Sequence, residues 1–154
     1  MPLTVYTSPA VYAAITLALM LILPIVSSLL EVFLGNHGAF APGIFLRWFV
    51  FWAVGVGLLL AGMRQIVQPQ HTAETLLGTK SSDAGMTHLS IGIVGAFSIV
   101  DADWIVPVGL VGALTYGLAG IKHVLHKPRA RNQNIALVSD LGIALVLGVL
   151  LLPI

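Results

Sequence analysis

Long uninterrupted apolar runs, separated by short polar stretches, dominate the pattern of this chain. Each of the four longest runs has about 20 residues or more and can cross a hydrocarbon core of about 30 Å as an α-helix. These runs cover residues 11–34, 44–67, 104–125 and 135–154. The pattern therefore predicts an all-α protein, a polytopic transmembrane helical bundle that forms one domain over residues 1–154.

A fifth apolar segment, residues 84–100, lies at the lower length limit for a span, at about 17 residues. It is compatible with a short transmembrane helix or with a re-entrant one. With five spans, all of the seven Lys and Arg residues except Arg47 lie on one side of the membrane. The positive-inside rule makes that side the cytoplasm. We therefore expect five helices with a cytoplasmic N-terminus, and four helices plus a re-entrant segment as the alternative.

Composition agrees with this class. The chain is 58% hydrophobic and only 8% charged, whereas a soluble domain carries about 25% charged residues. The net charge of +1 gives no reason to expect a nucleic-acid partner. Because the chain has no cysteine, disulfides, thiolate metal sites and cysteine nucleophiles are excluded.

Ionisable residues within the apolar runs are the candidate functional residues, because a charge in lipid is costly and usually has a partner or a use. His88 and Asp140 fall in rows of small residues spaced by four, which mark the faces where membrane helices pack. With five spans, both lie near the cytoplasmic edge of the bundle, as Arg64 does. We predict a buried polar cluster there. Its members are Arg64, Gln65, His88, Ser139 and Asp140.

Two interpretations of this cluster stay open. In the first, Asp140 forms a structural ion pair with a residue of another helix, with Arg64 as first choice and His88 as second. In the second, His88 and Asp140 carry a proton or orient a polar ligand, because histidine exchanges protons near neutral pH.

Two pairs of charged residues are expected on the external side. Glu31 and Arg47 flank one short loop, so a salt bridge between them would join the first two helices. Asp101 and Asp103 lie in the turn before the helix that starts at Trp104, where Asp103 is the expected N-cap. These two aspartates are weak candidates for binding a hard cation, and no metal site is predicted.

Three further local features have simple interpretations. Pro24 is expected to kink the first helix, because proline removes one backbone hydrogen bond. Residues 72–78 resemble a short interfacial helix. The basic loop 122–131 is expected to contact anionic lipid headgroups.

Residues 51–78 and 134–142 carry a family resemblance. Their sequences, FWAVGVGLLLAGMRQIVQPQHTAETLLG and NIALVSDLG, resemble a family of small, uncharacterised bacterial integral membrane proteins known only as a domain of unknown function. The resemblance implies a multi-pass protein of the bacterial inner (plasma) membrane, and it brings no activity, cofactor or catalytic residue. A looser likeness to the DoxX-like membrane proteins rests on general architecture alone.

Three classes of function follow from these observations. The first is a structural or accessory subunit, in a larger membrane complex or a homo-oligomer. The second is a small transporter or channel that uses the polar cluster. The third is a membrane enzyme acting on lipid or quinone, although no catalytic motif and no cofactor signature is present. The first class is our leading expectation, and catalysis the least expected.

Overall fold

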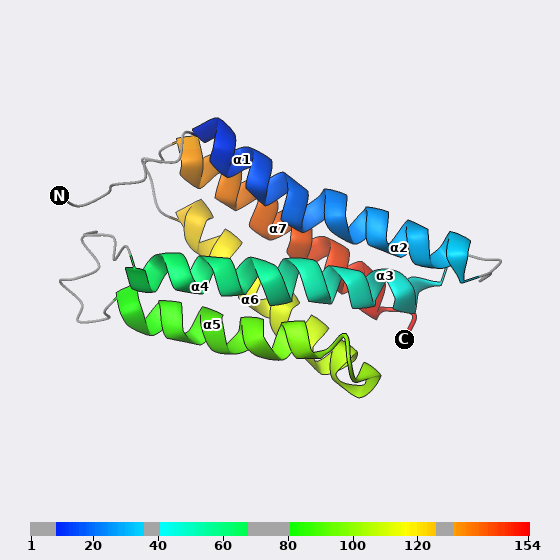
Figure 1. Ribbon diagram of the computed structural model, residues 1–154. Coiled ribbons are helices and arrows are strands. Elements are labelled where there is room, and N and C mark those ends of the chain that lie inside the picture. The colour runs from blue at the N-terminus through cyan, green and yellow to red at the C-terminus, as the bar shows by residue number, and fades with distance from the viewer. Residues whose placement is uncertain (1–8, 36–40, 68–80, 126–130) are drawn as a thin grey trace.

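The structure is a computed structural model that describes residues 9–35, 41–67, 81–125 and 131–154. All regular secondary structure in these ranges is helical and forms five long helices (Figure 1). The first long helix consists of α1 (Pro9–Leu17), the π-helix η1 (Ala18–Ile22) and α2 (Leu23–Leu34). The second consists of α3 (Pro42–Phe49), the π-helix η2 (Val50–Gly57) and α4 (Leu58–Val67). The others are α5 (Ser81–Phe97), α6 (Ile105–Leu125), preceded by the 3-10 turn η4 (Ala102–Trp104), and α7 (Arg131–Leu151).

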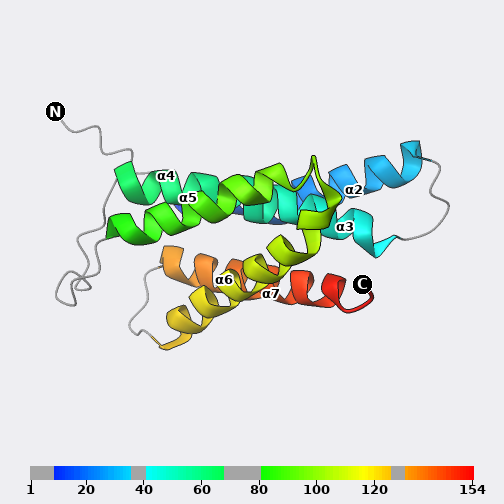
Figure 2. The ribbon, with the colours of Figure 1, turned by 90° about the horizontal axis from the view of Figure 1, so that it is seen from below.

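Four of these helices are long and apolar enough to cross a membrane, as the hydrophobic runs predict. They are Ala13–Leu34, Pro42–Val67, Ala102–Leu125 and Asn134–Leu151. The segment in question, α5, is one unbroken helix of 17 residues, about 26 Å long. It lies alongside the second long helix rather than turning back on itself (Figures 1 and 2). The described part of the chain therefore has five helices.

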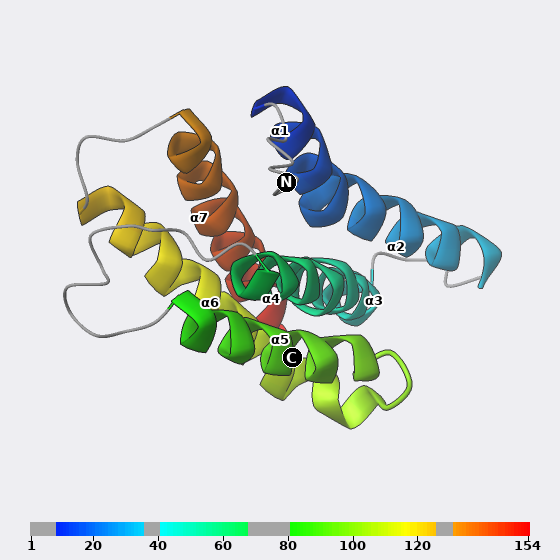
Figure 3. The same ribbon diagram turned by 60° about the vertical axis from the view of Figure 1, so that its left-hand side comes forward.

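The first long helix is irregular next to Pro24, as expected. Because proline has no N–H, the regular α-helical ladder cannot continue through it, and the turn before it is the π-helix η1. Pro24 is itself buried, and its carbonyl accepts a hydrogen bond from Ser28 Oγ at 2.7 Å. The helix changes direction between α1 and α2 (Figure 3).

Glycines bring the second long helix and α5 into backbone contact. A Cβ atom added to Gly55 would lie 2.7 Å from the Ala96 nitrogen, and one added to Gly92 would lie 2.5 Å from the Leu59 nitrogen. A Cβ on Gly62 would likewise lie 2.7 Å from the Gly85 oxygen. No side chain fits at these positions, which is how small residues let membrane helices approach closely.

The apolar core lies where the second long helix meets α6 and α7. Leu46, Val50 and Val54 are fully buried on the second long helix, and Leu147 of α7 is buried against them. In contrast, α1 and η1 bury none of the residues whose burial is described there, and among such residues of the first long helix only Pro24 and Ser28 are buried. The first long helix is therefore the most loosely packed part of the described bundle.

We expect Gly92→Ala to destabilise the bundle by about 1–3 kcal/mol, because the added methyl group forces α4 and α5 apart. Gly148→Ala is the matched control, since a Cβ there meets nothing within 4 Å. Its stability should be unchanged, or higher by up to about 1 kcal/mol, because alanine is the better helix former. The measurement is the fraction of folded protein that survives heating in mild detergent. Equal loss in both variants would contradict the glycine contact.

Candidate functional site

The five residues of the predicted cluster lie on three helices. Arg64 and Gln65 are on α4, His88 is on α5, and Ser139 and Asp140 are on α7. Helix α4 packs chiefly on α5, and α7 packs chiefly on α6. The structure therefore divides the predicted cluster into two groups.

The first group lies between α4 and α5. Gln65 Oε1 and His88 Nδ1 are buried and have no hydrogen-bond partner within the described ranges. A Cβ on Gly85, three residues before His88, would lie 3.1 Å from Gln65 Cβ, so these side chains belong to the same helix contact. Arg64 is exposed at the end of α4. Polar atoms without partners are costly in an apolar setting, so a water molecule or a polar ligand group is expected between these helices.

The second group lies between α6 and α7. Asp140 Oδ2 is 3.7 Å from Nε2 of His123, so the two side chains form an ion pair whenever the imidazole is protonated. Ser139 Oγ donates a hydrogen bond to the Ala136 carbonyl of its own helix at 2.9 Å. No hydrogen bond or ion pair links either residue to α4 or α5 in the described structure.

The expected partners of Asp140 are therefore wrong. A partner from another helix is present, but it is His123 rather than Arg64 or His88. The physical reason is that α6 and α7 follow each other in the chain and pack as a hairpin, with the side chain of Leu141 over Gly120. His123 lies one turn beyond Gly120 and so meets Asp140 at the same depth. The spacing between Gly120 and His123 can be read from the sequence, whereas the arrangement of the helices in space cannot.

The Glu31–Arg47 pair predicted between the first two helices is present. Arg47 Nη2 donates to Glu31 Oε2, and Trp48 Nε1 donates to the same oxygen at 2.6 Å. The guanidinium carbon also lies 5.6 Å from the centre of the Trp48 ring, a cation–π distance. One turn further along, Trp52 Nε1 donates to Ser27 Oγ at 3.0 Å. The two tryptophan donors were not predicted. The sequence does contain a signal for them, because Trp48 and Trp52 are four residues apart, as are their acceptors Ser27 and Glu31.

A third polar contact, also not predicted, joins α6 to the second long helix. Tyr116 Oη donates to the Ala53 carbonyl at 2.5 Å inside the core. Ala53 belongs to the π-helix η2, where the backbone ladder is irregular. Gly57 leaves room for the hydroxyl, because a Cβ there would lie 3.2 Å from Tyr116 Oη.

The turn before α6 differs from the expectation. Asp101, not Asp103, is the N-cap, and its Oδ1 accepts a hydrogen bond from the Asp103 backbone nitrogen at 3.1 Å. The reason is that helical structure starts two residues earlier than predicted, with η4 at Ala102. Both carboxylates are exposed, and the searched residues contain no group of three or more potential metal ligands. The weak cation candidate at Asp101 and Asp103 therefore gains no support.

Two expectations lie outside the described residues. The interfacial helix at 72–78 falls wholly within the range 68–80, and the basic loop 122–131 includes residues 126–130.

The described residues form an all-helical fold in which four helices are long and apolar enough to cross a membrane. Residues 13–153 match the Family of unknown function (DUF6790), and the chain belongs to that family. No curated protein and no solved structure matches the chain significantly. The match confirms the resemblance to an uncharacterised family, and the comparisons give no support for the DoxX-like likeness.

The position of Asp140 predicts coupling to His123. We expect Asp140→Asn and His123→Gln each to destabilise the protein, and the double variant to cost less than their sum by about 0.5–3 kcal/mol. Arg64→Gln combined with Asp140→Asn is the matched comparison, and its effects should add. Thermal unfolding of the three single and two double variants in detergent measures both couplings. Coupling to Arg64 instead of His123 would overturn this assignment.

Proposed function

We propose that this protein spans the bacterial inner membrane five times, with its N-terminus in the cytoplasm, and acts as a structural or accessory subunit of a membrane complex or of a homo-oligomer. Helix α5 is the fifth span in this proposal. Its support is its position alongside α4 and the resulting asymmetry of the basic residues.

The main support for the accessory role is that the polar side chains form contacts between pairs of helices. Glu31 joins α2 to α3, Asp140 joins α7 to α6, and Tyr116 joins α6 to η2. Each contact fixes one pair of helices, and these contacts do not converge on a common cavity. Such an arrangement sets the register of a bundle, whereas a catalytic or transport site needs its polar groups together.

The outer faces of the bundle support the same role. Large apolar side chains are strongly exposed on α6 and α7, including Leu118 at 65% and Leu145 at 68%. Patches of this kind on membrane helices contact lipid or the helices of another subunit. A transporter built on Arg64, His88 and Asp140 loses its main support, because these residues are divided between two helix pairs.

The topology is tested with reporter fusions. A reporter placed after Ile154 should be read as external, and one inserted within residues 126–133 as cytoplasmic, because five spans place these positions on opposite sides. If both report the same compartment, α7 does not cross the membrane and the five-span proposal fails.

The accessory role is tested by cross-linking in native membranes. The sequence contains no cysteine, so Leu118→Cys and Leu145→Cys introduce single reactive thiols on exposed faces. The buried Leu147→Cys is the control. We expect a defined product larger than one chain from at least one exposed position and none from the control, with the partner identified by mass spectrometry. A single-chain particle in mild detergent, without cross-links, would refute the proposal.

A further inference from the structure

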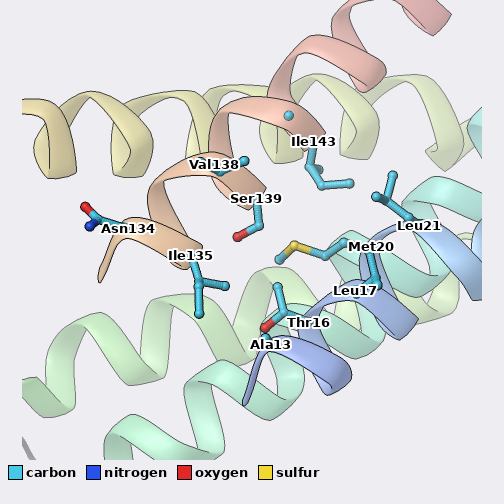
Figure 4. Close-up of a pocket in the computed structure, with 11 residues that line it drawn as sticks. Ala13, Thr16, Leu17, Met20, Leu21, Asn134, Ile135, Val138, Ser139 and Ile143 are labelled. Atoms are coloured by element: carbon cyan, nitrogen blue, oxygen red, sulfur yellow. The ribbon is translucent and has the colours of Figure 1, made fainter. Parts of the chain in front are cut away.

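A cavity of about 600 Å³ lies between the first long helix and α7 (Figure 4). Its walls are apolar almost throughout, and the hydroxyl of Ser139, one of its few polar groups, already donates to its own helix. Lipid chains are as apolar as these walls, so they fill the cavity without specific recognition. A site that selects its occupant has to offer polar atoms in need of partners, and such atoms lie between α4 and α5.

The polar atoms in need of partners are Gln65 Oε1 and His88 Nδ1. Both atoms are buried without a hydrogen-bond partner among the described residues, although each residue as a whole is only partly buried. Thr87 and Ser90 are the described polar side chains nearest to His88 in α5. Both are exposed, and their hydroxyls donate to carbonyls of their own helix. The partner of Gln65 and His88 therefore has to come from outside the described side chains.

The two side chains lie on the same side of the contact between α4 and α5. These helices run in opposite directions (Figure 1), since Gly62 faces Leu89 whereas Gln65, further along α4, faces Gly85. Gln65 follows the contact residue Gly62 by three positions. His88 follows the contact residue Gly85 by the same number. In an antiparallel helix pair, positions with the same offset from the contact residues flank the contact on one side.

The two side chains are also close along the helix axis. A Cβ on Gly85 would lie 3.1 Å from Gln65 Cβ, so these two residues are at one level. His88 is three residues further along α5, which is about 4.5 Å. One water molecule, with hydrogen bonds of about 2.7–3.2 Å to each side, spans an offset of this size.

The occupant of this site has to donate and accept hydrogen bonds. Gln65 Oε1 is an acceptor, whereas each ring nitrogen of a neutral imidazole is either a donor or an acceptor. Water satisfies Oε1 together with either form of His88 Nδ1. An ion would have to leave water for an apolar helix contact, which is costly. The searched residues also contain no group of three or more potential metal ligands.

We propose that one water molecule bridges Gln65 Oε1 and His88 Nδ1 and thereby joins α4 to α5. This site goes beyond the accessory role and does not depend on it, because both residues belong to one chain. Gln65 is two residues from the end of α4 at Val67, so the water enters from that end of the helix pair. The bridge adds a polar contact to the glycine contact between the two helices.

The direct test is a crystal structure of the full chain, grown in a lipidic phase, at a resolution that shows ordered water. We expect one water molecule within about 2.7–3.2 Å of both Gln65 Oε1 and His88 Nδ1. An empty site, a direct hydrogen bond between the two side chains, or a metal ion identified by its anomalous signal would overturn the proposal. So would either side chain turned toward lipid.

Variants test the same site in detergent. Gln65→Leu and His88→Leu each leave the other group short of a partner, and each should lower the midpoint of thermal unfolding by about 2–10 °C. The double variant should lower it by less than the sum, because neither polar group is then left buried. His88→Gln keeps a side chain that donates and accepts, and should retain most of the stability of the parent.

Gln65→Leu combined with Ser90→Ala is the matched control. Its two shifts should add, because Ser90 is exposed and bonds only within its own helix. Additive losses at Gln65 and His88 would show that the two groups share no occupant and would overturn the proposal. If a leucine variant does not fold, the crystal structure of the parent decides, since it needs no substitution.

Discussion

The backbone contact between the second long helix and α5 is the interaction on which the remaining arrangement depends. Gly55, Gly62 and Gly92 let these two helices approach until no Cβ fits between them. This contact covers one face of the second long helix, so α6 and α7 must pack on the others, around Val50 and Val54. Because α4 packs on α5 in this contact, Arg64 and His88 lie in a different helix pair from Asp140.

The apolar surfaces leave the register between neighbouring helices undetermined, and polar contacts fix it. In a hydrocarbon environment there is little hydrophobic drive between helices, so a hydrogen bond or ion pair decides where one helix stops against the next. The oxygen of Glu31 that receives both Arg47 and Trp48 does this at one end of the first long helix. Asp140 with His123 does it near the middle of α7. Toward the other end of the first long helix, η1 buries no residue.

The helices of the bundle are packed unevenly, and this is relevant to the proposed role. The second long helix, α5, α6 and α7 form a packed unit, whereas the first long helix is attached mainly through Glu31, Ser27 and the tryptophans facing them. The π-helix before Pro24 gives that helix its change of direction. The buried core therefore depends little on the first long helix.

The sequence by itself determined the helical class, the positions of the long apolar helices, the irregularity at Pro24 and the Glu31–Arg47 pair. These depend on hydrophobic run length, on the missing N–H of proline, and on residues that flank one short loop. Only the tertiary structure decided which helices are neighbours, and hence that Asp140 meets His123 and that Tyr116 reaches the Ala53 carbonyl. Small residues mark a helix face as a contact surface, but many faces of this chain carry them. The choice among partners depends on atomic fit between backbones, which spacing in a sequence does not encode.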